Sequence, residues 1–285
     1  MHKLSTLFFA LIIFSCTKVE DVIIRDNTLP PDPTIENITI ETYINKLYIS
    51  TIGREPTQIE FFAGFEFLRN TNLSQESRDI IVDGILNKSE YPVKLFSLES
   101  ANILNGVDTS MIAERIDIYE SLLNNTSGPD SIFIVTELQR MLIFQQSILQ
   151  FNLGQIKIKE LYISMVNNNF FDEINMGTEN FVVAMFQHFL LRYPSSSELE
   201  AAKDMVDNNN AVVFFESGMG KDDFIDIFFA SEEYYSGQVH ILFNRYLFRD
   251  PTSSESVDFT LQYISSDDYR QLQKSILTSN EFIGL

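Results

Sequence analysis

The sequence predicts an all-α protein built from stacked helical hairpin repeats, and three observations support this fold class. A motif of the form Arg-x-Pro-[Ser/Thr]-x-x-Glu occurs three times, each time six residues after an aromatic residue. Each copy ends in an apolar-x-x-x-Glu-aromatic segment whose aromatic residue lies 33 to 42 residues after the Arg. Strand patterns are few, the best being the short run 211–215. Repeats of this length are typical of helical units that bury their apolar faces against one another.

The repeated motif marks the point where one helix stops and the next begins. Proline disfavours continuation of the preceding helix. Ser or Thr followed three residues later by Glu is a capping box, in which each side chain accepts a hydrogen bond from the other residue's N–H. The motif residues are Arg54, Pro56, Thr57 and Glu60; Arg192, Pro194, Ser195 and Glu198; and Arg249, Pro251, Thr252 and Glu255. We therefore expect new helices to start at the three Ser/Thr positions.

The repeated arginine has a functional and a structural interpretation. As a functional site, the three guanidinium groups would bind an anion. As structure, each suits the negative end of a helix dipole and can fork onto a carboxylate. The candidate carboxylates are Glu90, Glu233 and Glu281, one in each closing segment. Repetition in all three copies favours the structural role, so we predict partly buried arginines that are paired within their own repeats.

The N-terminus has the pattern of a secretory signal. A charged start precedes an apolar run over residues 4–14, which is too short to span a bilayer. Ile13-Phe14-Ser15-Cys16 resembles the lipobox of bacterial lipoproteins, in which the cysteine becomes the lipidated first residue of the mature chain. Cys16 is the only cysteine, so its lipidation leaves no thiol for a disulfide or a metal. An uncleaved anchor and ordinary secretion are the alternatives.

The residues after Cys16 bear on localisation. Lys18 followed by Glu20 and Asp21 resembles the signal that directs some Bacteroidetes-type lipoproteins to the cell surface. We therefore expect an outer-membrane lipoprotein and hypothesise exposure at the cell surface. Residues 17–36 contain three prolines and predict an extended tether, with the fold beginning near Ile38.

The remainder of the chain divides into three repeats and one irregular helical insert. The expected units are a signal peptide (1–15), the lipidated Cys and tether (16–37), repeat 1 (38–91), a helical middle region (92–177), repeat 2 (178–235) and repeat 3 (236–285). Repeat 1 predicts helices at about 40–52, 58–69 and 75–87. The apolar run 132–151 contains Glu137, Arg140 and four glutamines, which favours a buried core helix over a transmembrane span.

Composition and motifs exclude several classes of function. With 40 acidic and 20 basic residues the formal charge is −20, which argues against nucleic acid or anionic lipid headgroups as partners. No nucleotide-binding loop, zinc motif, haem attachment motif or nucleophile elbow occurs. His188 and His240 are the only histidines after the signal, and single histidines are typical of packing residues. The acidic pairs Asp222-Asp223, Glu232-Glu233 and Asp267-Asp268 suit helix starts; a calcium site or a glycosidase carboxylate pair is the alternative.

The segment from Tyr48 to Glu60, with its closing segment from Ile85 to Tyr91, resembles a group of bacterial helical domains of unknown function. These domains carry the signature Tyr-x-x-x-Leu-Gly-Arg-x-Pro-Thr-x-x-Glu and occur in secreted and envelope proteins, beside cytochrome-like modules or repeated in large surface proteins. Phycobilisome linker domains, which act as assembly adaptors, are similar in helical pattern. The resemblance covers the three repeats and implies no catalytic residue. Only the first copy has the signature Gly, at Gly53; Leu191 and Phe248 replace it in the others.

These observations favour a lipid-anchored interaction or scaffold protein of the outer envelope without a catalytic site. We expect its partner to be an envelope protein or a glycan, its membrane contact to be the lipid on Cys16, and no other cofactor. The alternatives are an envelope glycan-processing hydrolase that uses paired carboxylates, and an accessory subunit of a secretion or electron-transfer complex.

Overall fold

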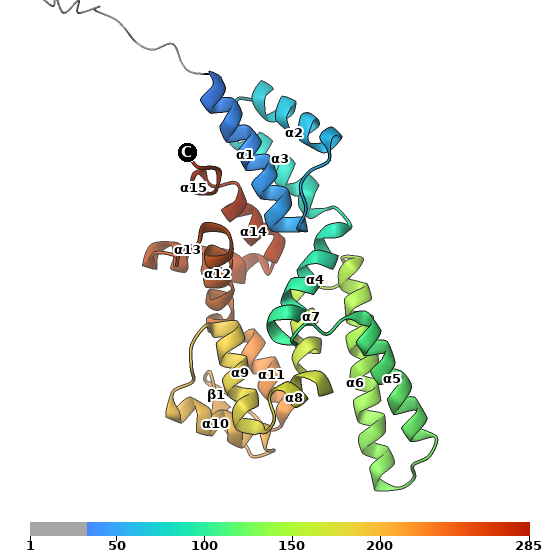
Figure 1. Ribbon diagram of the computed structural model, residues 1–285. Coiled ribbons are helices and arrows are strands. Elements are labelled where there is room, and N and C mark those ends of the chain that lie inside the picture. Colours follow the sequence, from blue (N-terminus) through green and yellow to red (C-terminus); the bar gives the residue numbers. More distant parts are fainter. Residues whose placement is uncertain (1–32) are drawn as a thin grey trace, which may run out of the picture.

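A computed structural model describes residues 33–285, and over this range the chain is all-α as predicted (Figure 1). It forms 15 helices and one two-stranded hairpin there. The predicted signal peptide, Cys16 and most of the predicted tether lie outside the described residues. Among those residues, no helix combines the length and the apolarity that a bilayer span requires.

The first repeat folds close to its prediction. It consists of α1 (Pro33–Ile52), α2 (Gln58–Asn70) and α3 (Gln75–Leu86). The start expected near Ile38 is corrected, because α1 begins at Pro33. The N–H groups in the first turn of a helix have no partner within the helix. Proline, which has no N–H, is therefore tolerated at this position.

The middle region is helical and includes a projecting arm. It comprises α4 (Glu90–Ile103), α5 (Thr109–Leu123), α6 (Pro129–Asn152), α7 (Ile158–Val166) and α8 (Asn169–Ile174). The boundary expected at 91/92 is corrected, because it falls inside α4. Helices α5 and α6 form a long antiparallel pair that extends from the body, and we call this pair the α5–α6 arm (Figure 1). The buried core helix expected over 132–151 is corrected: α6 buries one face and leaves large apolar side chains exposed on the other.

Repeats 2 and 3 share a helix. Repeat 2 contains α9 (Thr178–Leu190), α10 (Ser196–Val206), β1 (Ala211–Val213), β2 (Glu216–Gly218) and α11 (Lys221–Ala230). Then follow α12 (Glu232–Leu247), α13 (Ser253–Ser266), α14 (Tyr269–Leu277) and α15 (Asn280–Ile283). The boundary expected at 235/236 is corrected, because it falls inside α12, which closes repeat 2 and opens repeat 3. The expected strand at 211–215 is seen as β1 and the turn into β2.

The first and last repeats pack against each other although they are far apart in the sequence. Helix α3 lies against α14, and α1 lies against α15 (Figure 1). Lys274 Nζ lies 3.1 Å from Asp83 Oδ1, and Arg78 Nη1 donates to Asn280 Oδ1 at 2.8 Å. This contact joins the two ends of the repeat series, so the body is closed rather than an open solenoid.

Aromatic side chains fill the core of repeats 2 and 3. The ring of Phe189 on α9 meets those of Tyr162 and Phe229 edge-on, with centroids 5.1 and 5.0 Å apart. Helix α12 approaches α9 closely, because a Cβ at Gly237 would lie 2.0 Å from the Phe189 carbonyl oxygen. Glycine is therefore required where these two backbones cross.

Candidate functional site

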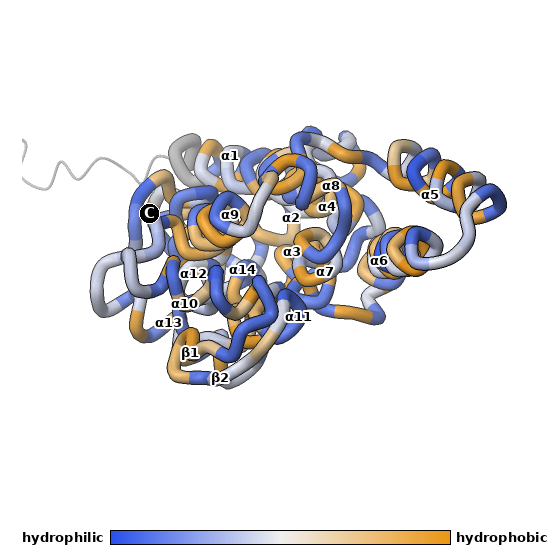
Figure 2. The backbone as a smooth tube through the Cα atoms, turned by 90° about the horizontal axis from the view of Figure 1, so that it is seen from below, coloured by the Kyte–Doolittle hydropathy of each residue, from blue (hydrophilic) through white to orange (hydrophobic). Residues whose placement is uncertain are grey.

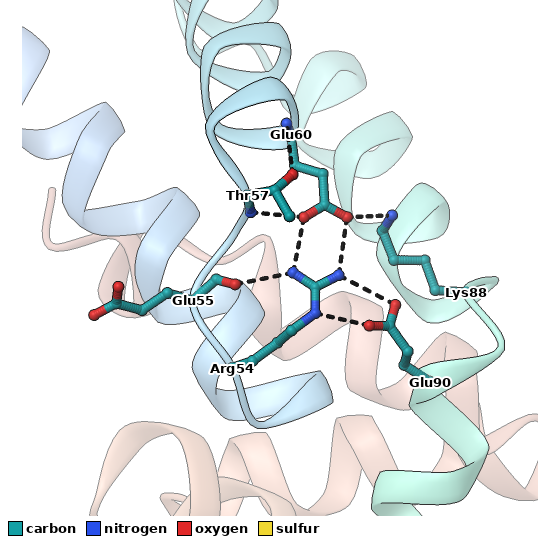
Figure 3. Close-up of polar contacts among 6 residues, drawn as sticks. All are labelled: Arg54, Glu55, Thr57, Glu60, Lys88 and Glu90. Atoms are coloured by element: carbon teal, nitrogen blue, oxygen red, sulfur yellow. Dashed lines mark hydrogen bonds and ion pairs between the residues drawn. The ribbon is translucent and has the colours of Figure 1, made fainter.

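Arg54 at the first repeat junction uses all its donors within the protein (Figure 3). Its Nε and Nη2 donate to the two carboxylate oxygens of Glu90 at 2.7 and 3.2 Å. Its Nη1 and Nη2 donate to the two oxygens of Glu60 at 2.8 and 3.0 Å. The remaining N–H donates to the carbonyl oxygen of Glu55 at 2.9 Å. All five N–H groups of a guanidinium are then occupied, which leaves no donor for an external anion.

The same arrangement recurs at the other two junctions. Arg192 binds Glu198 and Glu233, with Nη2 distances of 2.6 and 2.8 Å. Arg249 binds Glu255 and Glu281, with Nη2 distances of 2.7 and 2.6 Å. About a third of each arginine side chain is exposed. The predicted pairing with the closing-segment glutamates is therefore confirmed, and the structural interpretation of the arginines holds.

The capping glutamate has a second role that the sequence analysis missed. The three capping boxes form as predicted, at Thr57, Ser195 and Thr252. Each box glutamate also accepts two hydrogen bonds from the junction arginine, as Glu198 does from Arg192. The fixed spacing of six residues between Arg and Glu was the available signal. The cap and the ion pair are thus one connected unit, in which a single carboxylate holds the start of a helix and the preceding turn.

The residue before each junction arginine adopts a left-handed backbone conformation. Gly53, Leu191 and Phe248 have φ values of 76°, 56° and 57°. This turn places each guanidinium over the ring six residues earlier; for Arg192 and Phe186 the distance to the ring centroid is 4.9 Å. The aromatic residue of the motif is therefore explained as a cation–π partner. Leu and Phe adopt this conformation at a steric penalty that Gly avoids.

The junction carboxylates are stabilised in their charged form. Hydrogen bonds from Arg192 lower the pKa of Glu198 to about 2, and those from Arg249 lower the pKa of Glu255 to about 2. Arg54 likewise lowers the pKa of Glu60. These carboxylates remain ionised far below neutral pH, so they are poor general acids.

The acidic pairs predicted for helix starts take part in caps and ion pairs. Asp223 accepts from the backbone N of Met219 at 2.8 Å, and Asp267 accepts from Lys157 Nζ at 2.7 Å. Asp268 caps α14, Asp222 accepts from Asn167, and Glu233 belongs to the second junction. Within residues 33–285 no group of three His, Cys, Asp or Glu side chains is placed to hold a metal ion. Five of the six carboxylates in these pairs therefore have hydrogen-bond or ion-pair partners within the protein.

The α5–α6 arm carries an unusual exposed surface. Ile132, Ile143 and Leu149 of α6 and its C-cap residue Leu153 are 69, 59, 52 and 62% exposed. Hydrophobic residues recur along both helices of the arm where it stands apart from the body (Figure 2). Val135, Leu142 and Leu149 follow one another at intervals of seven residues, as do Ile132, Gln139, Gln146 and Leu153. This spacing is that of a coiled-coil seam. We call these seven residues the α6 seam.

The opposite face of α6 holds the arm in place. Ile134, Met141, Phe144 and Ile148 are buried on it. The ring of Phe144 meets Phe96 of α4 at a centroid distance of 6.3 Å. Arg115 of α5 donates to Glu173 of α8 at 2.8 Å. The arm is therefore fixed at its base, and the α6 seam is a second apolar face beyond the one that folding buries.

Comparison with protein-family models, with curated proteins and with solved structures finds no match. The resemblance of the repeats to bacterial envelope domains and to phycobilisome linkers therefore stays a prediction. The geometry of this chain's own residues is what supports a function.

Proposed function

We propose that this protein is a lipid-anchored interaction protein of the bacterial outer envelope, which binds a partner protein through the α5–α6 arm. The observation that carries the proposal is the α6 seam at heptad spacing, in which Ile132, Leu142, Leu149 and Leu153 are exposed apolar residues. Large apolar surfaces on a folded chain mark interaction sites. The repeat junctions, by contrast, satisfy their charges internally.

The spacing of the α6 seam indicates what kind of partner fits it. A helix that presents residues every three or four positions binds another helix with a matching apolar face. Gln139 and Gln146 interrupt the apolar row and are exposed. Polar residues at such positions fix the register between two helices. The partner therefore presents an amphipathic helix with polar groups opposite these glutamines.

Charge favours a different protein over a second copy of this chain. Residues 109–152 contain five acidic and two basic side chains, and the whole chain has a formal charge of −20. Two such arms repel each other, whereas basic side chains beside the partner's apolar face attract the arm. The occupant is thus an amphipathic helix flanked by Lys or Arg.

The placement of the arm fits a tethered protein. Helix α1, which follows the proposed lipid anchor at Cys16 and the tether, begins at one end of the molecule, and the tip of the arm lies at the other (Figures 1 and 2). A chain anchored through its N-terminus can therefore present the arm away from the membrane. The lipid is the membrane contact in this proposal.

The test compares seam variants of the full-length protein in its own host. The double variant Leu142→Glu, Leu149→Glu places charges in the α6 seam, and Thr136→Glu, Gln145→Glu adds the same charge at exposed polar positions of the same helix. After mild detergent extraction, a specific protein is expected to co-purify with the parent and the control and to be lost from the seam variant. Identical co-purifying proteins from all three, or a complex containing only copies of this chain, would contradict the proposal.

A further inference from the structure

An open apolar groove lies between α2 and α3 of the first repeat, and α1 forms its floor. It has a volume of about 440 Å³, within the range of ligand-binding sites. Its walls are accessible, because Ile59 of α2 and Ile80 of α3 are 84 and 52% exposed. The small residues Ala63 and Gly84, one on each wall, are exposed as well. We call this feature the α2–α3 groove.

The other two repeats show that folding does not require apolar walls at this place. Counted from the capping residue of the motif, Ile59 corresponds to Ser197 in repeat 2 and to Ser254 in repeat 3. Counted back from the closing glutamate, Ile80 corresponds to an aspartate in repeat 2 and to a glutamine in repeat 3. The first repeat therefore exposes two large apolar side chains where its relatives have polar ones. Such apolar surface is typical of an interaction site.

Repeat 2 shows what the equivalent groove accommodates. Its helices α10 and α11 follow the second motif as α2 and α3 follow the first, and the β1–β2 hairpin packs against both. Phe214 in the turn of this hairpin stacks on Phe186 and meets Phe228 edge-on, with ring centroids 5.8 Å apart in both pairs. These two partners correspond to Tyr48 and Ile85, which line the α2–α3 groove. In repeat 2, then, a phenylalanine carried by a hairpin occupies this place.

The backbone of the hairpin covers a second part of the same surface. A Cβ at Gly218 of β2 would lie 3.0 Å from Ile227 and 3.2 Å from Met205. These residues correspond to Gly84 and Phe67 of the α2–α3 groove. Met205 under the hairpin is 0% exposed, whereas Phe67 is only partly buried. The surface that repeat 2 covers with its own chain is thus open in repeat 1.

Repeat 3 fills the equivalent place in another way, and repeat 1 has neither solution. Phe259 of α13, seven residues after the capping residue, meets the motif ring of Phe243 at a centroid distance of 5.2 Å. The first repeat has Gly64 at that position. It also joins α2 to α3 through the four residues 71–74 alone, which is too short a connection to hold a hairpin. The groove is therefore left for a group from outside the chain.

We propose that the α2–α3 groove binds a partner protein that inserts a phenylalanine side chain from a hairpin turn. The partner supplies what repeat 2 takes from its own sequence. Aromatic side chains that fill apolar pockets are the usual anchors of protein interfaces. The formal charge of −20 makes two copies of this chain repel each other, which favours a different protein as the occupant. Helices α2 and α3 lie apart from the α5–α6 arm (Figure 1), so this site does not depend on the α6 seam.

The test uses a synthetic cyclic peptide with the sequence of residues 211–218, closed so that it holds the hairpin turn. Its binding to the full-length protein is measured by fluorescence anisotropy, and we expect saturable binding with a Kd on the order of 100 µM. The peptide with Phe214→Ala should bind at least tenfold more weakly. The peptide with Phe215→Ala is the matched control and should bind like the parent peptide, since Phe215 points away from the groove of repeat 2 and is 101% exposed there. No saturable binding, or equal binding of the two variant peptides, would overturn the proposal.

Two variants of the protein place the same ring inside and outside the groove. Gly84→Phe fills the groove, because a Cβ at Gly84 meets nothing within 4 Å. It is expected to weaken peptide binding at least tenfold while the melting temperature stays level or rises, since glycine is a poor helix former. Glu76→Phe adds a ring at an exposed position of α3 outside the lining and should leave peptide binding unchanged.

Two results with these variants would contradict the proposal. Equal peptide affinity in the parent and in Gly84→Phe would show that the peptide binds elsewhere. Self-association of the parent protein that Gly84→Phe abolishes, measured by analytical ultracentrifugation, would identify a second copy of this chain as the occupant.

Discussion

The body bonds the charged side chains of its repeat junctions internally, whereas the α5–α6 arm leaves apolar side chains exposed. At the three repeat junctions every N–H of the arginines is bonded within the protein, and at Gly237 the backbones of α9 and α12 are in direct contact. Along α6, by contrast, the α6 seam is exposed, although its heptad spacing is that of a face that packs against another helix. The difference separates what holds the fold together from what is available for binding. Substitutions at the repeat junctions and at the α9–α12 crossing should therefore alter stability, and substitutions in the α6 seam should alter interactions alone.

The largest effect is expected at the α9–α12 crossing. Gly237→Ala places a Cβ 2.0 Å from the Phe189 carbonyl oxygen, so the helices must move apart at a cost of about 3 kcal/mol in the free energy of unfolding. Urea denaturation followed by circular dichroism measures it. The matched control is Gly84→Ala on α3, where a Cβ meets nothing within 4 Å. There we expect a gain of up to about 1 kcal/mol. Equal effects of the two variants would refute the close contact.

The next effect concerns the junctions. Arg192→Met removes the hydrogen bonds to Glu198 and Glu233 and leaves two carboxylates facing each other. We expect a loss of about 2 kcal/mol in the free energy of unfolding, because hydrogen bonds between charged groups are stronger than those between neutral groups. Arg69→Met removes a more exposed pair with Glu66 and should change the free energy of unfolding by less than about 0.5 kcal/mol. A loss no greater than the control's would show that the junction is not a stabilising unit.

Acid should weaken the same junctions. The folded-state pKa of Glu198 and of Glu255 is about 2, below the unfolded value of about 4.3. Their contribution is therefore complete above the unfolded pKa and is lost as the pH falls from about 5 towards 2. The urea midpoint of the parent is expected to drop over this range. The urea midpoint of Arg192→Met should fall less over the same range. Equal falls in the two proteins would argue against the junction carboxylates as the origin of the acid sensitivity.

The smallest effect is expected at the left-handed position before the third arginine. Phe248 has a φ of 57° and is 83% exposed, so Phe248→Gly removes steric strain and little buried surface. The strain relieved exceeds the entropic penalty of glycine, and the net gain should be about 0.5 kcal/mol. The reciprocal variant, Gly53→Ala, should lower the free energy of unfolding. A loss in Phe248→Gly would mean that the ring makes stabilising contacts.

Sequence reasoning predicted the junctions well because their motifs recur in all three repeats. The capping box lies at a fixed spacing from each arginine, and the arginine partners Glu90, Glu233 and Glu281 belong to a closing segment that every repeat carries. The helix shared by repeats 2 and 3 was missed, since a single helix that ends one unit and opens the next carries no boundary signal.

The long-range features were not predictable in this way. The pairing of α3 with α14, and the ion pair between Glu99 and Arg245, join residues far apart in the chain. The apolar character of the α6 segment was evident from the sequence. Whether its second apolar face is buried or exposed was not, because the sequence pattern is the same in both cases.

Site-specific photocrosslinking in intact cells tests the role of the arm most directly. A photoreactive amino acid is placed at Leu149 in the α6 seam or at Val257, a comparably exposed apolar position on α13. We predict one discrete adduct with another protein from Leu149 and none from Val257. The same adducts from both positions, or an adduct from Leu149 that contains only this chain, would contradict a partner-binding arm.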